Sequence, residues 1–275
     1  MATPDILTSI RGRRFGIGPN GELILNGTRI AGATPADLWK HAPSLNDHDP
    51  SRFFMFFDDF LNPASATASD YHAYTSNNDG ATGTNAFRDE AGGIMNIVTA
   101  AADNDYQALS SIAENWLFAA GKELWFEARF RIAEATTNES TWWFGFTDTL
   151  TTGGMQANTG GPLASYDGAL IWKTPETALT VNFETSNAGT QNTLSAFATA
   201  ISNTWHRAGF YFDGAATTST ITPYFHNGTD WTVGAATDIT LSGLEEMHLV
   251  FGVKAGPTAA AETLQVDYIK ALQLR

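Results

Sequence analysis

The chain has 275 residues, of which 43% are hydrophobic and 16% charged, and it contains no cysteine. This length suits one large domain with an appendage or two smaller domains, and the missing cysteines exclude disulfides and thiolate metal sites. The net charge is −14, although residues 1–40 carry five basic and only three acidic side chains. The acidic remainder repels phosphate, and no apolar run is long enough to span a bilayer. We therefore expect neither nucleic-acid nor membrane partners.

Residues 1–33 predict a small β-hairpin arm. Two turn signals, Pro19-Asn20-Gly21 and Asn26-Gly27, separate short apolar segments, and Asn-Gly accepts the positive φ angles that a tight hairpin turn requires. An isolated hairpin is only marginally stable in water, so we expect this arm to dock on another surface. Its docking candidates are basic and apolar side chains, namely Arg11, Arg13, Arg14, Phe15, Leu23 and Leu25. A solvated basic loop is the alternative interpretation of the arginines.

Residues 34–51 predict a linker, because Thr34-Pro35 can begin one helical turn and the part that follows is polar and interrupted by prolines. The domain boundary is therefore expected near residue 50, and residues 52–275 predict one β-sandwich. Within that sandwich, residues 61–86 are rich in Ala, Ser, Thr, Asn and Gly. We expect a long loop there, of the kind that is usually functional or wrapped over a partner.

Short strands separated by Gly, Asn and Asp turns, with almost no helical periodicity, indicate a sandwich or jelly roll. The expected strands cover residues 53–60, 93–99, 106–112, 123–132, 141–147, 169–173, 178–184, 205–213, 220–226, 248–254 and 263–272. Alternate residues from Leu124 to Ile132 are apolar, whereas Trp125 begins an alternating set of aromatic and charged side chains. This pattern predicts an all-β fold, an antiparallel two-sheet jelly-roll sandwich with one exposed sheet face.

Four segments resemble the concanavalin A-like lectin/glucanase jelly roll of the laminin-G type: residues 57–60, 123–130, 205–214 and 266–270. In addition, the hairpin of residues 18–27, followed by a Pro-containing connector and a jelly roll, is similar to virion proteins of tailed bacteriophages. That resemblance implies a structural virion protein, chiefly a capsid decoration (cement) protein. Its partners would be the major capsid protein or another virion protein and further copies of itself. Its place would be the virion, after assembly in the host cytoplasm.

A carbohydrate-binding module on a phage head or tail is the alternative function. Trp142 and Trp143 are adjacent, so a regular strand points them to opposite sheet faces. With Trp125 and Trp172, one of them would form a stacking platform for sugars on the exposed sheet. The competing interpretation is that a second layer, a long loop or a neighbouring subunit covers these tryptophans.

A diverged glycoside hydrolase is the third interpretation. The nearest carboxylate pair, Glu123 and Glu127, would be about 13 Å apart on a strand that rises about 3.3 Å per residue, too far for either glycosidase geometry. We therefore expect no enzymatic activity. No histidine or acidic residue stands in a metal-ligand spacing, so no metal or cofactor is expected. Calcium remains open, because the resemblance to laminin-G-like domains implies it; its candidate ligands are Asp58, Asp59, Asp79, Asp103 and Asp105.

Overall fold

The computed structural model divides into two compact units, Met1–His41 and Ala42–Arg275. The division falls within residues 34–51, where the sequence predicts a linker. The structure describes residues 9–10, 13–17, 23–25, 28–29, 38–39, 42–43, 50–61, 74–80, 83–88, 93–134, 139–157, 160–173, 179–216 and 218–275. None of these residues belongs to a helix that is long and apolar enough to cross a membrane.

The first unit contains a small antiparallel sheet. Its strand order is β1 (Ser9–Ile10), β2 (Arg13–Ile17), β3 (Leu23–Leu25) and β4 (Thr28–Arg29). β2 and β3 form the predicted hairpin, in which Phe15 pairs with Leu25 and Ile17 with Leu23. Of the docking candidates, Arg13, Arg14 and Phe15 lie on β2, Leu23 and Leu25 lie on β3, and Arg11 lies outside the described residues.

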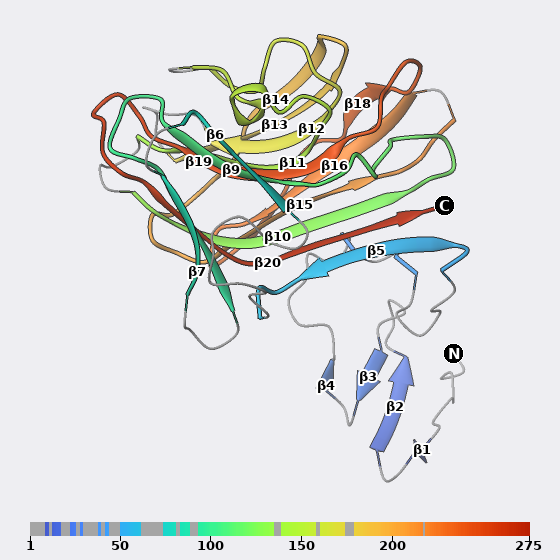
Figure 1. Cartoon of the computed structure of the whole chain (residues 1–275). Coiled ribbons are helices and arrows are strands. Elements are labelled where there is room, and N and C mark those ends of the chain that lie inside the picture. Colours follow the sequence, from blue (N-terminus) through green and yellow to red (C-terminus); the bar gives the residue numbers. More distant parts are fainter. Residues whose placement is uncertain are drawn as a thin grey trace. The chain divides into compact units, whose positions relative to one another are not determined.

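The second unit is a sandwich of two antiparallel sheets (Figure 1). One sheet contains β5 (Phe53–Asp58), β7 (Thr84–Arg88), β8 (Ile94–Val98), β10 (Leu124–Ala133), β15 (His206–Phe212), β16 (Thr218–His226), β17 (Trp231–Val233), β18 (Thr237–Thr240) and β20 (Thr263–Leu274). Its main order is β17-β16-β15-β10-β20-β8-β7, while β18 pairs with β16 and β5 with β20. We call it the nine-stranded sheet.

The other sheet, called the seven-stranded sheet, contains β6 (Tyr74–Asn78), β9 (Tyr106–Ser111), β11 (Thr141–Thr147), β12 (Gly168–Lys173), β13 (Thr180–Asn187), β14 (Thr190–Thr199) and β19 (His248–Lys254). Its order is β14-β13-β12-β11-β19-β9-β6. The connection between β11 and β12 carries a short 3-10 turn, η1 (Thr151–Gly154).

The hydrophobic core lies between the two sheets and is built largely from phenylalanine rings. The alternating apolar residues that begin at Leu124 are buried on β10 as predicted. Phe126 packs on Phe210 of β15 with ring centroids 5.2 Å apart, and Phe130 packs on Phe144 of β11 at 4.4 Å. The second of these contacts joins the two layers, because β10 and β15 belong to one sheet and β11 to the other. The predicted all-β antiparallel sandwich is confirmed.

The strands that the sequence did not predict lie at sheet edges. Residues 61–86 are not one continuous loop, because they contain β6 and most of β7, the last strands of the two sheets. β14 is likewise the edge of the seven-stranded sheet, and most of its side chains are exposed or half-buried. An edge strand that is open to solvent buries few side chains. Its polar sequence therefore lacks the apolar alternation by which strands are recognised.

Candidate functional site

The three tryptophans predicted to form a sugar platform are buried, at 0% exposure for Trp142 and Trp143 and 1% for Trp125. This corrects the prediction, because none of them presents an open ring. Trp142 points between the sheets, where it contacts Phe130 at 4.7 Å and stacks on Phe225 at 6.1 Å between centroids. Trp125 projects to the other side of the nine-stranded sheet from Phe126, and its ring stacks on Tyr211 at 5.4 Å.

Trp143 lies on the outer face of the seven-stranded sheet, but the connection between β11 and β12 covers it. Together they form a second hydrophobic cluster, whose buried members are Ala108, Trp143, Met155, Tyr166, Leu170, Trp172 and Val250. Gly153 in this connection lies so close to Trp143 that a Cβ atom there would come within 3.0 Å of the indole. The loop is therefore packed directly onto the sheet, which agrees with the competing interpretation that a loop covers this tryptophan.

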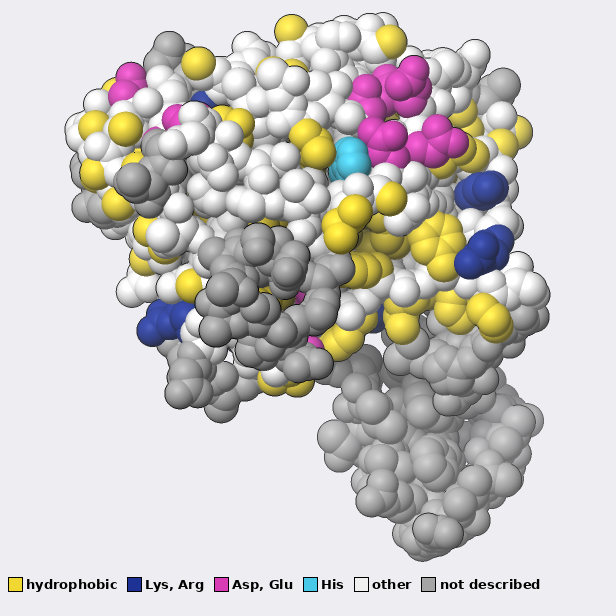
Figure 2. Space-filling view, in the orientation of Figure 1, with side chains coloured by type: hydrophobic (Ala, Val, Ile, Leu, Met, Phe, Trp, Pro, Cys, Tyr) yellow, Lys and Arg dark blue, Asp and Glu magenta, His cyan; other side chains and the backbone are white. Residues whose placement is uncertain are grey.

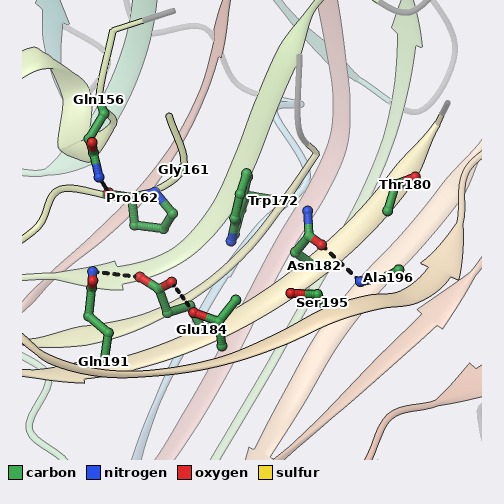
Figure 3. A pocket seen from close by; sticks show the side chains of 11 residues that line it. Gln156, Gly161, Pro162, Trp172, Thr180, Asn182, Glu184, Gln191, Ser195 and Ala196 are labelled. Atoms are coloured by element: carbon green, nitrogen blue, oxygen red, sulfur yellow. Dashed lines mark hydrogen bonds between the residues drawn. The ribbon is translucent and has the colours of Figure 1, made fainter. Parts of the chain in front are cut away.

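Next to this cluster, the outer face of β12, β13 and β14 is hollowed into a pocket of about 450 Å³ (Figure 3). We call it the Trp172 pocket. It is lined by Gln156, Gly161, Pro162, Trp172, Thr180, Asn182, Glu184, Gln191, Thr193, Ser195 and Ala196. Its volume lies within the range of about 300–1,000 Å³ that is usual for small-ligand sites.

The register of three neighbouring strands brings the lining side chains together. Trp172 on β12 is the cross-strand partner of Asn182 on β13, and Glu184 on β13 is the partner of Thr193 on β14. Asn182 and Glu184 are two residues apart, so they project from the same sheet face. On its other side, Trp172 is the partner of Trp143 on β11. The pocket therefore begins where the covered tryptophan cluster ends.

A β-bulge between β13 and β14 fixes the side chain of Asn182. The pairing register shifts between Val181 and Phe183, and Ala196 opposite adopts a φ of 53°. In this conformation the backbone N–H of Ala196 donates a hydrogen bond to Oδ1 of Asn182 at 2.9 Å. Bulges of this kind turn a strand locally and re-aim its side chains. The Asn182 amide is therefore held in one orientation at the pocket wall.

Glu184 is the acidic group of the pocket, and it is 5% exposed. Its Oε1 accepts hydrogen bonds from Gln191 Nε2 at 2.8 Å and from the Tyr166 hydroxyl at 3.2 Å, and its Oε2 accepts one from Thr193 Oγ1 at 2.6 Å. Burial raises the pKa of Glu184, while the hydrogen bonds from Thr193 and Tyr166 lower it and so partly offset burial. The carboxylate is thus positioned by three donors, two from β14 and one from the β11–β12 connection.

The loop side of the pocket is held by glutamine side chains. Gln191 Nε2 also donates to the carbonyl of Leu163 at 2.7 Å, and Gln156 Nε2 donates to the carbonyl of Pro162 at 2.6 Å. Gly161 lies against the indole of Trp172, and a Cβ atom at this position would come within 2.6 Å of Cη2 and Cζ2. Figure 3 shows Trp172 between Gly161 and Pro162 on one side and Asn182 on the other.

The outer face of the nine-stranded sheet is polar and aromatic as predicted, but its side chains engage one another. The carboxylate of Glu127, 3% exposed, pairs with Arg207 Nε at 2.6 Å. Arg129 and Arg131 both lie over the ring of Trp205, at 4.6 and 4.9 Å from its centroid. Such pairs satisfy the charges within the sheet. We therefore place the candidate site in the Trp172 pocket.

Two of the candidate calcium ligands, Asp79 and Asp105, interact directly. The carboxyl groups of Asp79 and Asp105 are hydrogen-bonded; burial first, and then this bond, raise the pKa of Asp105 to about 6. Asp58 Oδ1 accepts a hydrogen bond from the backbone of Phe60 at 2.8 Å, and Asp103 accepts one from Asn104 at 2.9 Å. In the described part of the chain, no three His, Asp or Glu side chains are arranged to hold a metal ion.

Sequence reasoning weighed Trp172 but missed Asn182, Glu184 and Gln191. Asn182 and Glu184 alternate with buried Val181 and Phe183 on β13, which is the pattern of any half-buried strand. Gln191 lies on β14, a strand that the sequence did not reveal. Only the pairing of three strands shows that these side chains meet.

No protein-family model matches the chain, and no curated protein matches its sequence. Several solved structures are similar to it in fold. Peanut lectin superposes with a TM-score of 0.55 at 12% identity over 81% of this chain and 98% of the lectin. Lectin II from Ulex europaeus gives a TM-score of 0.55 at 10% identity, over 80% and 98% of the two chains. The endo-β-1,4-glucuronan lyase from the fungus Trichoderma reesei gives 0.51 at 12% identity, over 78% and 94%. These similarities confirm the concanavalin A-like jelly roll.

Proposed function

We propose that the second unit is a carbohydrate-binding module and that the Trp172 pocket is its sugar site. The observation that carries the proposal is the convergence of an indole with amide and carboxylate groups, from Asn182, Glu184 and Gln191, in one open hollow. A sugar presents apolar C–H faces beside hydroxyls that both donate and accept hydrogen bonds. Aromatic rings and planar polar side chains match those two kinds of surface.

The pocket supplies both hydrogen-bond donors and acceptors to such a ligand. The amide of Gln191 uses its N–H₂ group for Glu184 and Leu163, so its Oε1 is available as an acceptor. The hydroxyls of Thr180 and Ser195, which also line the pocket, can do either. These groups are fixed by strands and by the β-bulge. A ligand therefore meets a largely preformed surface, which lowers the entropic cost of binding.

We propose that the pocket binds sugars without cleaving them. Most glycoside hydrolases use two carboxyl groups on either side of the scissile bond. Among the eleven lining residues, Glu184 is the one carboxylate. Incubation with the polysaccharides that bind should therefore release no reducing ends and no unsaturated products. The appearance of either, lost in Glu184→Gln, would assign an enzymatic role to the pocket instead.

A glycan array probed with the full-length protein tests the binding proposal. We expect signals from a related set of glycans, competed by the corresponding free oligosaccharides. Ser195 is exposed at the pocket wall. The variant Ser195→Trp places a bulky side chain there and should abolish the array signals. An array that stays blank at high protein concentration contradicts the proposal.

The virion role remains a second proposal, supported by the separate first unit. A four-stranded sheet of such short strands has little surface for a core of its own, which favours attachment to a partner surface. Expressing the chain with the structural genes that neighbour its own, and purifying the particles, tests this role. Many copies per particle for the full chain, and none for residues 42–275 alone, would support docking through the first unit. Absence of the full chain from the particles would contradict it.

A further inference from the structure

We infer that the Trp172 pocket selects uncharged glycans and rejects acidic ones such as uronic-acid polymers, and that Glu184 sets this preference. The inference rests on the proposed function, because it names the class of sugar that the same pocket takes. It makes Glu184 a specificity-determining residue, a role distinct from catalysis.

The charges around the pocket carry the inference. None of the eleven lining residues is a lysine, an arginine or a histidine, and Glu184 alone is ionisable. A nearby cationic residue, Lys254, is buried, with 3% of its surface exposed. It donates to the backbone carbonyl of Gln156 and does not line the pocket. A sugar carboxylate bound here would therefore meet no described counter-charge on the pocket wall.

The hydrogen bonds of Glu184 favour its ionised form. All three of its partners, Tyr166, Gln191 and Thr193, donate to it. These donors complement the ionised carboxylate, which is an acceptor at both oxygens. A second carboxylate brought into the pocket would lose its hydration and face a like charge, and both effects oppose binding. The hydroxymethyl group of a neutral sugar meets neither penalty.

The charge of the whole protein acts in the same direction. The chain has a net charge of −14. On the face drawn in Figure 2, acidic side chains gather beside a histidine, whereas lysines and arginines are scattered. A polyanionic glycan approaching a protein of this net charge is repelled over about a Debye length, which slows its association.

The test compares pairs of oligosaccharides that differ only in charge. Cellohexaose, β-1,4-galactohexaose and maltohexaose, each paired with its C6-oxidised uronic form, are titrated into the full-length protein by calorimetry. We expect at least one neutral member to bind at least about tenfold more tightly than its acidic form. In Glu184→Gln, which keeps the side-chain shape, that ratio should fall to about threefold or less.

Ser195 is uncharged and exposed at the pocket wall, so it can be replaced by a residue of either charge without disturbing the fold. Ser195→Lys should lower the neutral-to-acidic ratio, and Ser195→Glu should raise it. Acidic members that bind the wild-type protein as tightly as neutral ones, or a ratio unchanged by both Ser195 variants, would overturn the inference and leave the sugar site standing. If neither neutral nor acidic members bind, and the array is blank, the proposed function fails as well.

Discussion

Trp142 and Trp143 are neighbours on β11, yet their indoles belong to two separate hydrophobic clusters. Trp142 lies in the core between the sheets, and Trp143 lies on the outer face beneath the β11–β12 connection. Both are fully buried. The strand therefore has no solvent-facing side at this point. The loop that covers Trp143 also supplies Gly161, Pro162 and Gln156 to the pocket. The packing of this loop on Trp143 therefore holds one wall of the pocket in place.

Replacing either tryptophan by alanine should lower the free energy of unfolding by about 3–5 kcal/mol, the usual cost of deleting a large buried side chain. The two losses should differ in location. Trp143→Ala should accelerate amide hydrogen exchange chiefly in the β11–β12 connection, whose Gly153 and Met155 lie in or against the same cluster, whereas Trp142→Ala should accelerate it across both sheets. Urea unfolding and hydrogen-exchange mass spectrometry measure the two effects. Equal exchange patterns in the two variants would show that the clusters are not independent.

Gly161→Ala should displace the indole of Trp172. The added Cβ atom would lie 2.6 Å from the ring, and the φ of Gly161 is not in the left-handed region, so the contact alone causes the effect. Overpacking of this kind costs about 1–3 kcal/mol in stability. Sugar affinity should fall with it, because the pocket wall moves. Ser165→Ala, an exposed change in the same loop, is the control. Unchanged stability and affinity in Gly161→Ala would contradict the close packing of Trp172.

His206 should make the protein lose stability as the pH falls from about 6.5 to about 4. Burial lowers the pKa of this histidine from 6.5 to about 4. In that window the unfolded chain binds a proton that the folded chain does not, so stability decreases with decreasing pH, by up to about 3 kcal/mol. The free energy of unfolding is measured for wild type and His206→Gln between pH 4 and pH 7.5. The contribution of His206 is the difference between their slopes against pH. Parallel curves would mean that His206 titrates normally.

Asp105 should have the opposite effect on stability, because its contribution should decrease as the pH rises. Its pKa is raised from 3.8 to about 6, so the folded protein holds a proton there that the unfolded chain releases. Its stabilising contribution is therefore full at low pH and lost as the pH rises from about 4 to 6. Asp105→Asn should be more stable than wild type at pH 7, with the gain shrinking toward pH 4. Asp230→Asn, an exposed change, should show no such trend. A constant difference between Asp105→Asn and wild type would contradict the shift.

The fold could be predicted from the sequence because its central strands are strongly patterned. β11 and β19 have the expected bounds, and β10 buries its predicted apolar face. The edge strands and the pocket could not be predicted from the sequence, and the physical reasons for the two are related. β14 is polar because one side is open to solvent, and that openness is also what makes Gln191 and Ser195 accessible to a ligand. The burial of Trp143 depends on a loop whose path no local pattern reveals.

The most direct test of the sugar site is a matched pair of variants on β14. Gln191 and Asn192 are adjacent and point to opposite sides of the strand, and each amide donates to a backbone carbonyl, of Leu163 and Asp238 respectively. Only Gln191 lines the pocket. The affinity for the strongest array glycan is measured by calorimetry for both variants. The account predicts a loss of at least about tenfold in Gln191→Ala and no significant change in Asn192→Ala. Equal affinities in the two variants would place the sugar elsewhere and contradict it.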